Sequence, residues 1–286
     1  MKHFILLLII IFSLISLFWN IDTIPPLLDA SLLSSRLISA AVSTGSILLI
    51  FFYAKNSLKS RNIALLSTWT FSLLPWTIEQ GRIISQPNVA LFFFITLLIL
   101  SQRSNLIQKL FLYGSIPIGF YILYPQFWVF KIDNLNFSIK SIINNVFILT
   151  SPDFIFFKNI TFWWGGVREI GIIHLSFLPF LVVGIYEVII NHKWNIFFWI
   201  GFILFISSLS PFFPESREFF LAIPFLSIII AFGINGFFKQ KSLISKVIFY
   251  LVFVMIVYDL AQFWHYYTVH YPQQILGNLS QIHEPF

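Results

Sequence analysis

Long apolar runs separated by short polar segments occupy most of this chain. The runs cover about residues 4–20, 37–54, 62–78, 87–101, 109–130, 172–190, 194–212, 219–238 and 247–264. A helix that crosses a membrane needs about 20 predominantly apolar residues. Within a bilayer the backbone polar groups must also be satisfied inside the chain, which favours helices. We therefore predict an all-α fold, a polytopic transmembrane bundle of about nine spans that forms one domain over residues 1–286.

The composition also indicates a membrane protein. Charged residues make up 10% of the chain and hydrophobic residues 58%, whereas a soluble domain carries about 25% charged residues. The net charge of +6 comes from basic residues spread along the loops, so it does not indicate nucleic-acid binding. Cysteine is absent, which excludes a disulfide framework and a thiol nucleophile. No small-residue cleavage motif follows the first apolar run, so we interpret this run as a retained span and not as a signal peptide.

The distribution of basic residues predicts the orientation, because cytoplasmic loops carry an excess of Lys and Arg. With the N-terminus inside and the C-terminus outside, the inner loops are short and basic, and Glu187 is the only acid near them. The loop 131–171 and the tail 265–286 then lie outside. Binding and catalysis often use such long connections. We expect an integral protein of a prokaryotic plasma membrane with its functional site on the outer face.

Ionisable and polar residues recur in every outer connection. They are Asp22, Asp29 and Arg36 at the first; Glu79, Arg82, Gln86 and Asn88 at the second; Lys158 and Arg168 at the third; Arg217 at the fourth; and Tyr267 in the tail. Charged residues at membrane depth are candidates for function, although arginines also anchor helices at the membrane surface. Guanidinium groups bind phosphate in bidentate fashion, and a carboxylate can deprotonate a hydroxyl. This combination suits a sugar linked to a lipid phosphate.

The sequence predicts no metal site. The histidines show no paired spacing of the kind that metal ligands adopt, and no Gly-rich phosphate loop is present. No cofactor is firmly implied, and a divalent cation stays an open alternative that no ligand spacing supports.

The segment SSRLISAAVSTGSILLIFFYAKNSLKSRNIALLSTWTFSLLPWTIEQGRIISQPNVALFF (34–94) resembles the second-to-fourth-helix region of GT-C-type membrane glycosyltransferases. These are the protein O-mannosyltransferase-like and aminoarabinose-transferase-like enzymes. The later motifs SPDFIFFK, FFPESREFF and HYYTVHYP continue the resemblance in the same order. The resemblance implies inverting transfer of a sugar from a polyprenyl-phosphate donor to an acceptor, which would be a glycan, a lipid or a protein. Membrane lipid is then the protein's surroundings, and nucleic acid is not a partner.

The resemblance also implies a role for each cation. Arg36 and Arg82 match arginines that open helices in the family, and Arg217 matches a late-loop arginine expected near the donor phosphate. Lys158 and Arg168 are expected to join them.

The family's essential acid lies in the first outer loop. Its counterpart here is Asp29, with Asp22 as the second choice. The family's loop is much longer than the roughly sixteen residues between Trp19 and Arg36. The residues expected to contact substrate are Glu79, Gln86, Asn88 and Tyr267. An acid often follows the family's second-connection motif, and Gln86 and Asn88 stand in that place.

Two other functions fit parts of the pattern. One is a non-catalytic relative, a scaffold or subunit left after reduction of the first loop. The other is a lipid or polysaccharide transporter, although transporters often show internal repeats and interrupted helices, and the sequence shows neither. Enzyme and scaffold differ in whether Asp29 can reach a donor phosphate held by Arg82 and Arg217.

Overall fold

The computed structural model describes residues 2–24, 32–83, 86–105, 107–108, 112, 114, 138–158, 167, 169–209, 217–240 and 242–282. Within these residues the fold is helical, with no strand. The α-helices are α1 (Lys2–Phe18), α2 (Leu32–Leu58), α3 (Arg61–Leu73), α4 (Pro75–Arg82), α5 (Gln86–Arg103), α8 (Ile139–Leu149), α9 (Leu178–Ile190), α10 (Trp194–Ser208), α11 (Ile223–Lys239), α12 (Leu243–His265) and α13 (Tyr271–Ile282). The predicted all-α class is confirmed.

Several of these helices could cross a membrane. Three segments are long and apolar enough, Leu33–Leu58, Phe219–Lys239 and Leu243–Gly277. The number rises to five if α4 with α5, and the segment Leu175–Ile190 with α10, are each counted as one broken span. Most of the apolar run 109–130 lies outside the described residues. The described helices therefore support a membrane protein, while nine spans and the orientation of the termini stay predictions.

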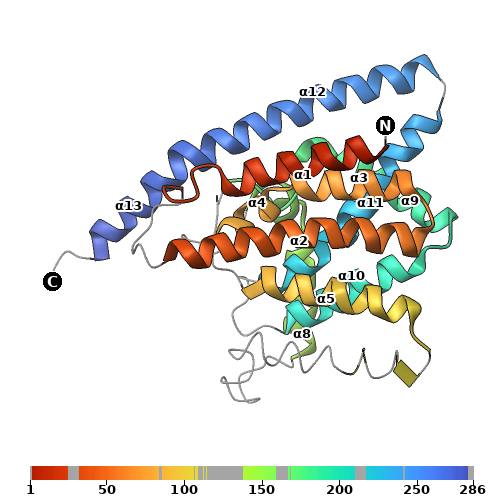
Figure 1. Ribbon diagram of the computed structural model, residues 1–286, viewed down its shortest axis with the longest axis horizontal. Coiled ribbons are helices and arrows are strands. Elements are labelled where there is room, and N and C mark those ends of the chain that lie inside the picture. The colour runs from red at the N-terminus through yellow and green to blue at the C-terminus, as the bar shows by residue number, and fades with distance from the viewer. Residues whose placement is uncertain are drawn as a thin grey trace.

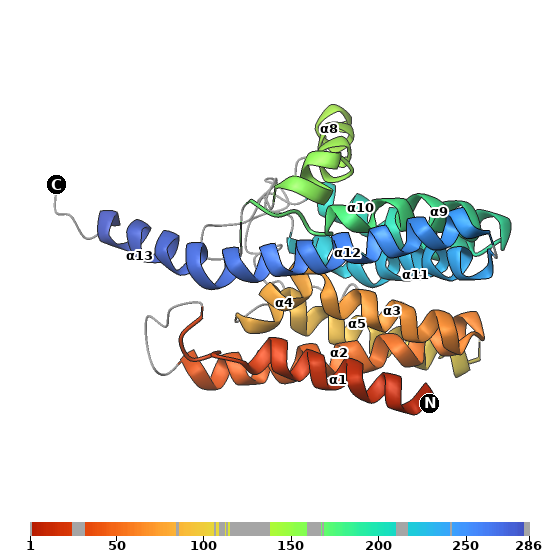
Figure 2. The ribbon, with the colours of Figure 1, turned by 90° about the horizontal axis from the view of Figure 1, so that it is seen from above.

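Helix α11 forms the centre of the bundle. Its apolar stretch is 94% buried, and it packs most extensively on α9 and α3. Two glycines permit the close approach of α9 and α11, because a Cβ at Gly184 would overlap the Ile229 carbonyl and one at Gly233 would overlap the Phe180 carbonyl. Small residues at helix contacts are the usual device for close packing in membranes. Seen from above, α1 to α5 form one layer and α9 to α12 the other, with α8 projecting from the second (Figure 2).

The two ends of the bundle differ in chemistry. At one end α2 passes into α3 and α11 passes into α12, and this basic end carries Lys55, Lys59, Arg61, Lys239 and Lys246. We call the other end of the bundle the polar end. Helix α1 ends there, α4 lies there, and α12 continues from there toward α13. Figure 1 shows the basic end at the right, with the N-terminus, and the polar end at the left, with the C-terminus.

Two regions that the sequence suggested to be irregular contain helix. The loop 131–171 includes α8 and a π-helical turn, Asp153–Phe157, and α8 is attached to the end of α10 by Asn145, whose Nδ2 donates to the Ser208 carbonyl at 2.9 Å. The tail continues from α12 through a π-helical turn, Tyr266–His270, into α13. The physical reason is a stripe of apolar residues at a spacing of four, since Tyr267, Tyr271 and Ile275 are all buried on one side.

Candidate functional site

The segment WTIEQGR forms a separate short helix, α4, at the polar end. Helix α3 ends at Leu73, the backbone of Leu74 is extended, and Pro75 opens α4, a position where its missing N–H has no cost. The break leaves the Leu73 carbonyl without an intrahelical partner, and the His174 Nε2 lies 3.1 Å from it. Every residue of α4 is buried. The sequence predicted the second outer connection here; the structure shows that this connection contains a short buried helix, and its place on the outer side stays a prediction.

Arg82 is fully buried at the end of α4 and is bonded to the backbone of the first connection. Its Nη1 donates to the Ser16 carbonyl at 2.8 Å, and its Nη2 donates to the carbonyls of Asn20 at 3.2 Å and Ile24 at 2.9 Å. Ser16 lies in the last turn of α1, where carbonyls lack intrahelical partners and carry partial negative charge. Arg82 therefore caps α1 and fixes the start of the connection that follows it.

Arg36 approaches the same connection from α2. Its side chain is largely buried, and its Nη1 donates to the Ile21 carbonyl at 3.2 Å. Arg36 and Arg82 are close enough to repel each other electrostatically, and Tyr267 and Tyr271 lie within range of Arg36. Two like charges that lie near each other inside a protein create a positive local potential, which the Glu79 carboxylate beside the same Tyr267 offsets in part. The two arginines are thus candidates to bind an anion at the polar end.

Glu79 connects α4 to the end of the long loop. It is 1% exposed, and its Oε1 accepts a hydrogen bond from the Val167 N–H at 2.8 Å. Val167 also belongs to an apolar cluster that brings α4, α12 and α13 together, formed by Ile78, Val167, Phe263, Tyr267, Tyr271 and Ile275. Glu79 therefore attaches the end of the loop to α4, and the apolar cluster packs the tail beside it.

Tyr267 lies at the centre of this cluster. Its ring stacks between Phe263 and Tyr271, with centroid distances of 5.6 and 5.4 Å, and the Arg82 Cζ lies 5.5 Å from its centroid. The Tyr267 hydroxyl lies near Arg82, yet among the described residues no group meets it with hydrogen-bond geometry. A buried hydroxyl without a partner beside a cation is a polar group that a ligand could satisfy.

Asn88 and Gln86 have different environments on α5. The Asn88 Nδ2 donates to the Ser39 carbonyl at 2.8 Å and to its Oγ at 3.0 Å, so it fastens α5 to α2. Its Oδ1 is buried without a hydrogen-bond partner in the described part of the chain. Gln86 is exposed. The structure does not bring these two amides together as a substrate-binding pair.

The remaining predicted residues lie apart from this cluster or outside the description. Asp22 is exposed on the turn after α1. Lys158 is exposed and forms an ion pair with Asp153 at 3.3 Å. Asp29, Arg168 and the side chain of Arg217 lie outside the described residues. The proposed clamp of Arg82 with Arg217 therefore stays a prediction.

Asp259 is a polar residue that sequence reasoning missed. It lies within α12, which the sequence predicts only as an apolar span, and its Oδ2 accepts a hydrogen bond from the Ser176 N–H at 2.9 Å. The bond attaches α12 to the 3₁₀ turn Leu175–Phe177 that precedes α9. A lone carboxylate in an apolar run was the signal that could have identified it.

The described residues contain no group of three or more His, Asp or Glu side chains placed to hold a metal ion. Comparisons with protein-family models, with curated proteins and with solved structures found no match. The function must therefore be inferred from the residues of the polar end themselves.

Proposed function

We propose that this protein is a GT-C-type membrane glycosyltransferase that uses a polyprenyl-phosphate sugar as donor. The observation that supports the proposal is that Arg36 and Arg82 both donate to the first connection, beside the Tyr267 hydroxyl, which is buried without a hydrogen-bond partner in the described part of the chain. A lipid phosphate would neutralise the repulsion between the guanidinium groups and accept the hydroxyl proton in a hydrogen bond. In the proposed topology of nine spans, the polar end faces the outside of a prokaryotic plasma membrane.

The hydrogen bonds of Arg82 lead us to propose different roles for the residues of the polar end. Arg82 already donates to three carbonyls, so we assign it to positioning the first connection and to the local positive potential. Arg36 and Tyr267 are the groups proposed to contact the donor phosphate. Asp29, five residues beyond the Ile24 carbonyl that Arg82 holds, is proposed as the base.

In the proposed reaction Asp29 removes the proton of the acceptor hydroxyl. The hydroxyl oxygen attacks the anomeric carbon of the sugar with inversion, and the bond between that carbon and the phosphate oxygen breaks. The departing phosphate keeps the electron pair, and the positive potential of the arginines stabilises it. The unknown acceptor stays a glycan, a lipid or a protein.

The test uses purified protein in liposomes with a panel of labelled polyprenyl-phosphate sugars. We expect transfer from one donor, and we expect Asp29→Asn to abolish transfer while donor binding persists, since the change removes only the proton acceptor. Arg36→Lys should weaken donor binding, because an ammonium group lacks the planar fork of the guanidinium. Lys193→Gln, at the opposite end of the bundle, is the control and should change neither quantity.

A non-catalytic scaffold is the second candidate, and the internal hydrogen bonds of Arg82 favour it. The two terminal nitrogens of this guanidinium donate to the protein's own carbonyls, so they need no ligand to be stable in the interior, although the Nε is buried without a partner in the described part of the chain. The scaffold reading predicts no turnover with any donor of the panel, and identical behaviour of the wild type and Asp29→Asn. A transporter, which we favour least, would move the labelled lipid across the liposome membrane without cleaving it.

A further inference from the structure

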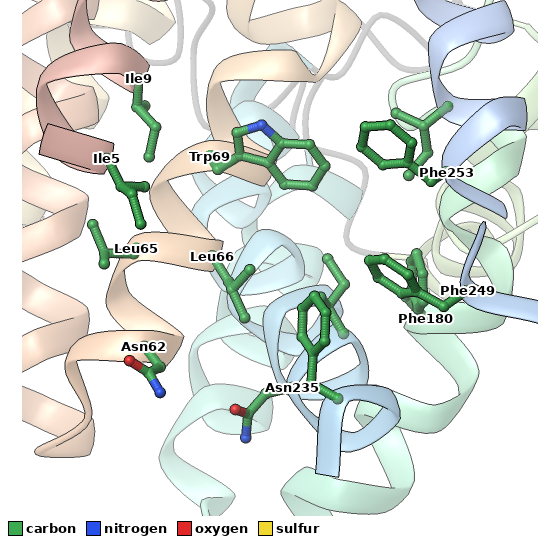
Figure 3. A pocket seen from close by; sticks show the side chains of 13 residues that line it. Ile5, Ile9, Asn62, Leu65, Leu66, Trp69, Phe180, Asn235, Phe249 and Phe253 are labelled. Atoms are coloured by element: carbon green, nitrogen blue, oxygen red, sulfur yellow. The ribbon is translucent and has the colours of Figure 1, made fainter. Parts of the chain in front are cut away.

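A cavity of about 470 Å³ lies near the basic end, far along the helices from α4. Five helices line it, namely α1, α3, α9, α11 and α12. Figure 3 shows Trp69, Phe249 and Phe253 around its apolar part. Its volume falls in the range of about 300–1,000 Å³ that is typical of ligand sites. The lining is apolar over most of its length, which indicates a hydrocarbon ligand.

The polar side chains of the lining mark one end of the cavity. Asn62 begins α3 and Asn235 lies in the last turns of α11, and Figure 3 shows both amides at the same end. In the described part of the chain neither amide has a side-chain hydrogen bond that would occupy it. The cavity thus has an apolar interior and a polar mouth at the basic end.

Two exposed lysines lie on the helix faces of α11 and α12 that line the cavity, on the side of the polar mouth. Lys239 lies four residues after Asn235 on α11, and Lys246 lies three residues before Phe249 on α12. Residues three or four apart share a helix face. Neither lysine forms an ion pair among the described residues.

Arg61 and Glu187 are two further charged residues at this end. Arg61 is adjacent to Asn62, and its Nε is buried without a partner in the described part of the chain. The acid Glu187 accepts a hydrogen bond from the Asn191 amide. Cations without an internal partner therefore predominate around the mouth.

The cavity opens to the side beside helix α12, because the lining side chains of Phe238 and Phe253 are exposed. Only 17% of the apolar stretch of α12 is buried, against 94% for the central segment that contains α11. Its outer face carries exposed apolar side chains, among them Leu243, Val247, Leu251 and Val254. In a membrane this face contacts lipid, so hydrocarbon chains are the molecules that stand next to the cavity.

We propose that this cavity binds one acyl chain of an anionic phospholipid, and that Lys239 and Lys246 bind its phosphate headgroup. The acyl chain fills the cavity with apolar contacts, and each buried methylene contributes favourably to the free energy of binding. Lysines near a membrane surface attract anionic lipids, which are abundant in the cytoplasmic leaflet. The basic end faces that leaflet in the proposed orientation. The inference depends on membrane insertion and not on glycosyl transfer.

The test uses the full chain in nanodiscs of phosphatidylglycerol and phosphatidylcholine, with a photoreactive group on the acyl chain of one lipid at a time. We expect phosphatidylglycerol to label the cavity residues of α3 and α12, and native mass spectrometry to show one retained phosphatidylglycerol. Lys239→Gln and Lys246→Gln should each lower the preference for phosphatidylglycerol by about fivefold. Lys55→Gln is the matched control, since α2 lines no part of the cavity, and it should keep the preference.

A second variant tests the chain separately from the headgroup. Leu66→Trp places a larger side chain in the cavity and should abolish labelling there, while labelling of the outer face of α12 persists. Equal retention of both lipids by the wild type would overturn the proposal, as would labelling spread evenly over α12. The proposal would also be overturned if polyprenyl phosphate displaced the label and phosphatidylglycerol did not. Cross-links from the cavity residues to a second copy of the chain, with no lipid labelling, would overturn it as well.

Discussion

Replacing Arg82 tests whether this residue is an internal anchor or a ligand clamp. Its guanidinium group donates to the carbonyls of Ser16, Asn20 and Ile24, so Arg82→Met leaves three acceptors without their donor. Arg82→Lys keeps the charge, but a single ammonium group cannot reproduce the fork that spans α1 and the turn after it.

The magnitude follows from the burial of each bond. The bond to Ser16 is buried, and the bonds to Asn20 and Ile24 are partly buried. A buried polar group left without a partner costs about 1–3 kcal/mol, and a partly buried one recovers some of this from water. We therefore expect Arg82→Met to lower the free energy of unfolding by roughly 2–4 kcal/mol and Arg82→Lys by about half as much. On the usual scale of 2–4 °C per kcal/mol, Arg82→Met should lower Tm by roughly 4–16 °C.

The assay is thermal unfolding of purified protein in detergent at a fixed scan rate, together with donor binding on the same samples. Lys193→Met is the matched control, because it removes a charge at the opposite end, and its Tm should change little. An anchor loses stability in both Arg82 variants. If Arg82→Lys kept the wild-type Tm and still lost donor affinity, the anchor assignment would be wrong and the clamp correct.

Three further predictions test packing and topology. Gly233→Ala should lower stability by about 1–3 kcal/mol through overpacking against the Phe180 carbonyl, whereas Gly201→Ala, where a Cβ meets nothing within 4 Å, should be tolerated in the same thermal assay. Asp259→Leu should cost about 1–3 kcal/mol, because the Ser176 N–H loses its acceptor, and protease sensitivity of α12 should rise. A reporter near Lys59 should be cytoplasmic and one fused after the C-terminal residue external; a cytoplasmic reading for both would refute the proposed topology.

The sequence predicted the helical class and most helix positions, because apolar periodicity and length decide both. It placed the end of the third span at residue 78, whereas the helix breaks at Leu74 and restarts at Pro75. Pro75 is visible in the sequence, but a proline can either open a new helix or kink one helix that continues through it. The sequence does not decide between these two cases. The tail was missed for a related reason, since the stripe of Tyr267, Tyr271 and Ile275 reads as interfacial aromatics until a partner surface is known.

The candidate site was predicted less completely, because composition does not reveal which group satisfies a charge. Arg82 and Glu79, which the sequence singled out as site candidates, are both buried, and their binding of donor or substrate stays a prediction. Their partners are backbone atoms of Ser16 and Val167, and backbone acceptors and donors leave no mark in a sequence. Lys239 and Lys246, read only as topology signals, form no ion pair in the described part of the chain, and the sequence does not show that the helices carrying them line a cavity.

The same backbone contacts bear on Asp22, one of the two acids that the first connection offers as a base. Arg36 and Arg82 hold this connection through the carbonyls of Ile21, Asn20 and Ile24, so its path does not depend on the side chain of Asp22. That side chain is exposed on the turn after α1, and no hydrogen bond in the described part of the chain fixes its position.

We therefore expect Asp22→Asn to keep transfer within about twofold of the wild type, because one surface charge changes local energies by less than about 0.5 kcal/mol. The measurement is the rate of transfer from the donor identified in the liposome panel, with Asp29→Asn assayed in parallel. Arg36→Lys should impair donor binding even though Arg36 lies in α2 and not in the first connection. The reason is that Arg36 donates to the backbone of this connection and is also proposed to bind the donor phosphate. A loss of transfer in Asp22→Asn with full activity in Asp29→Asn would exchange the roles of the two acids.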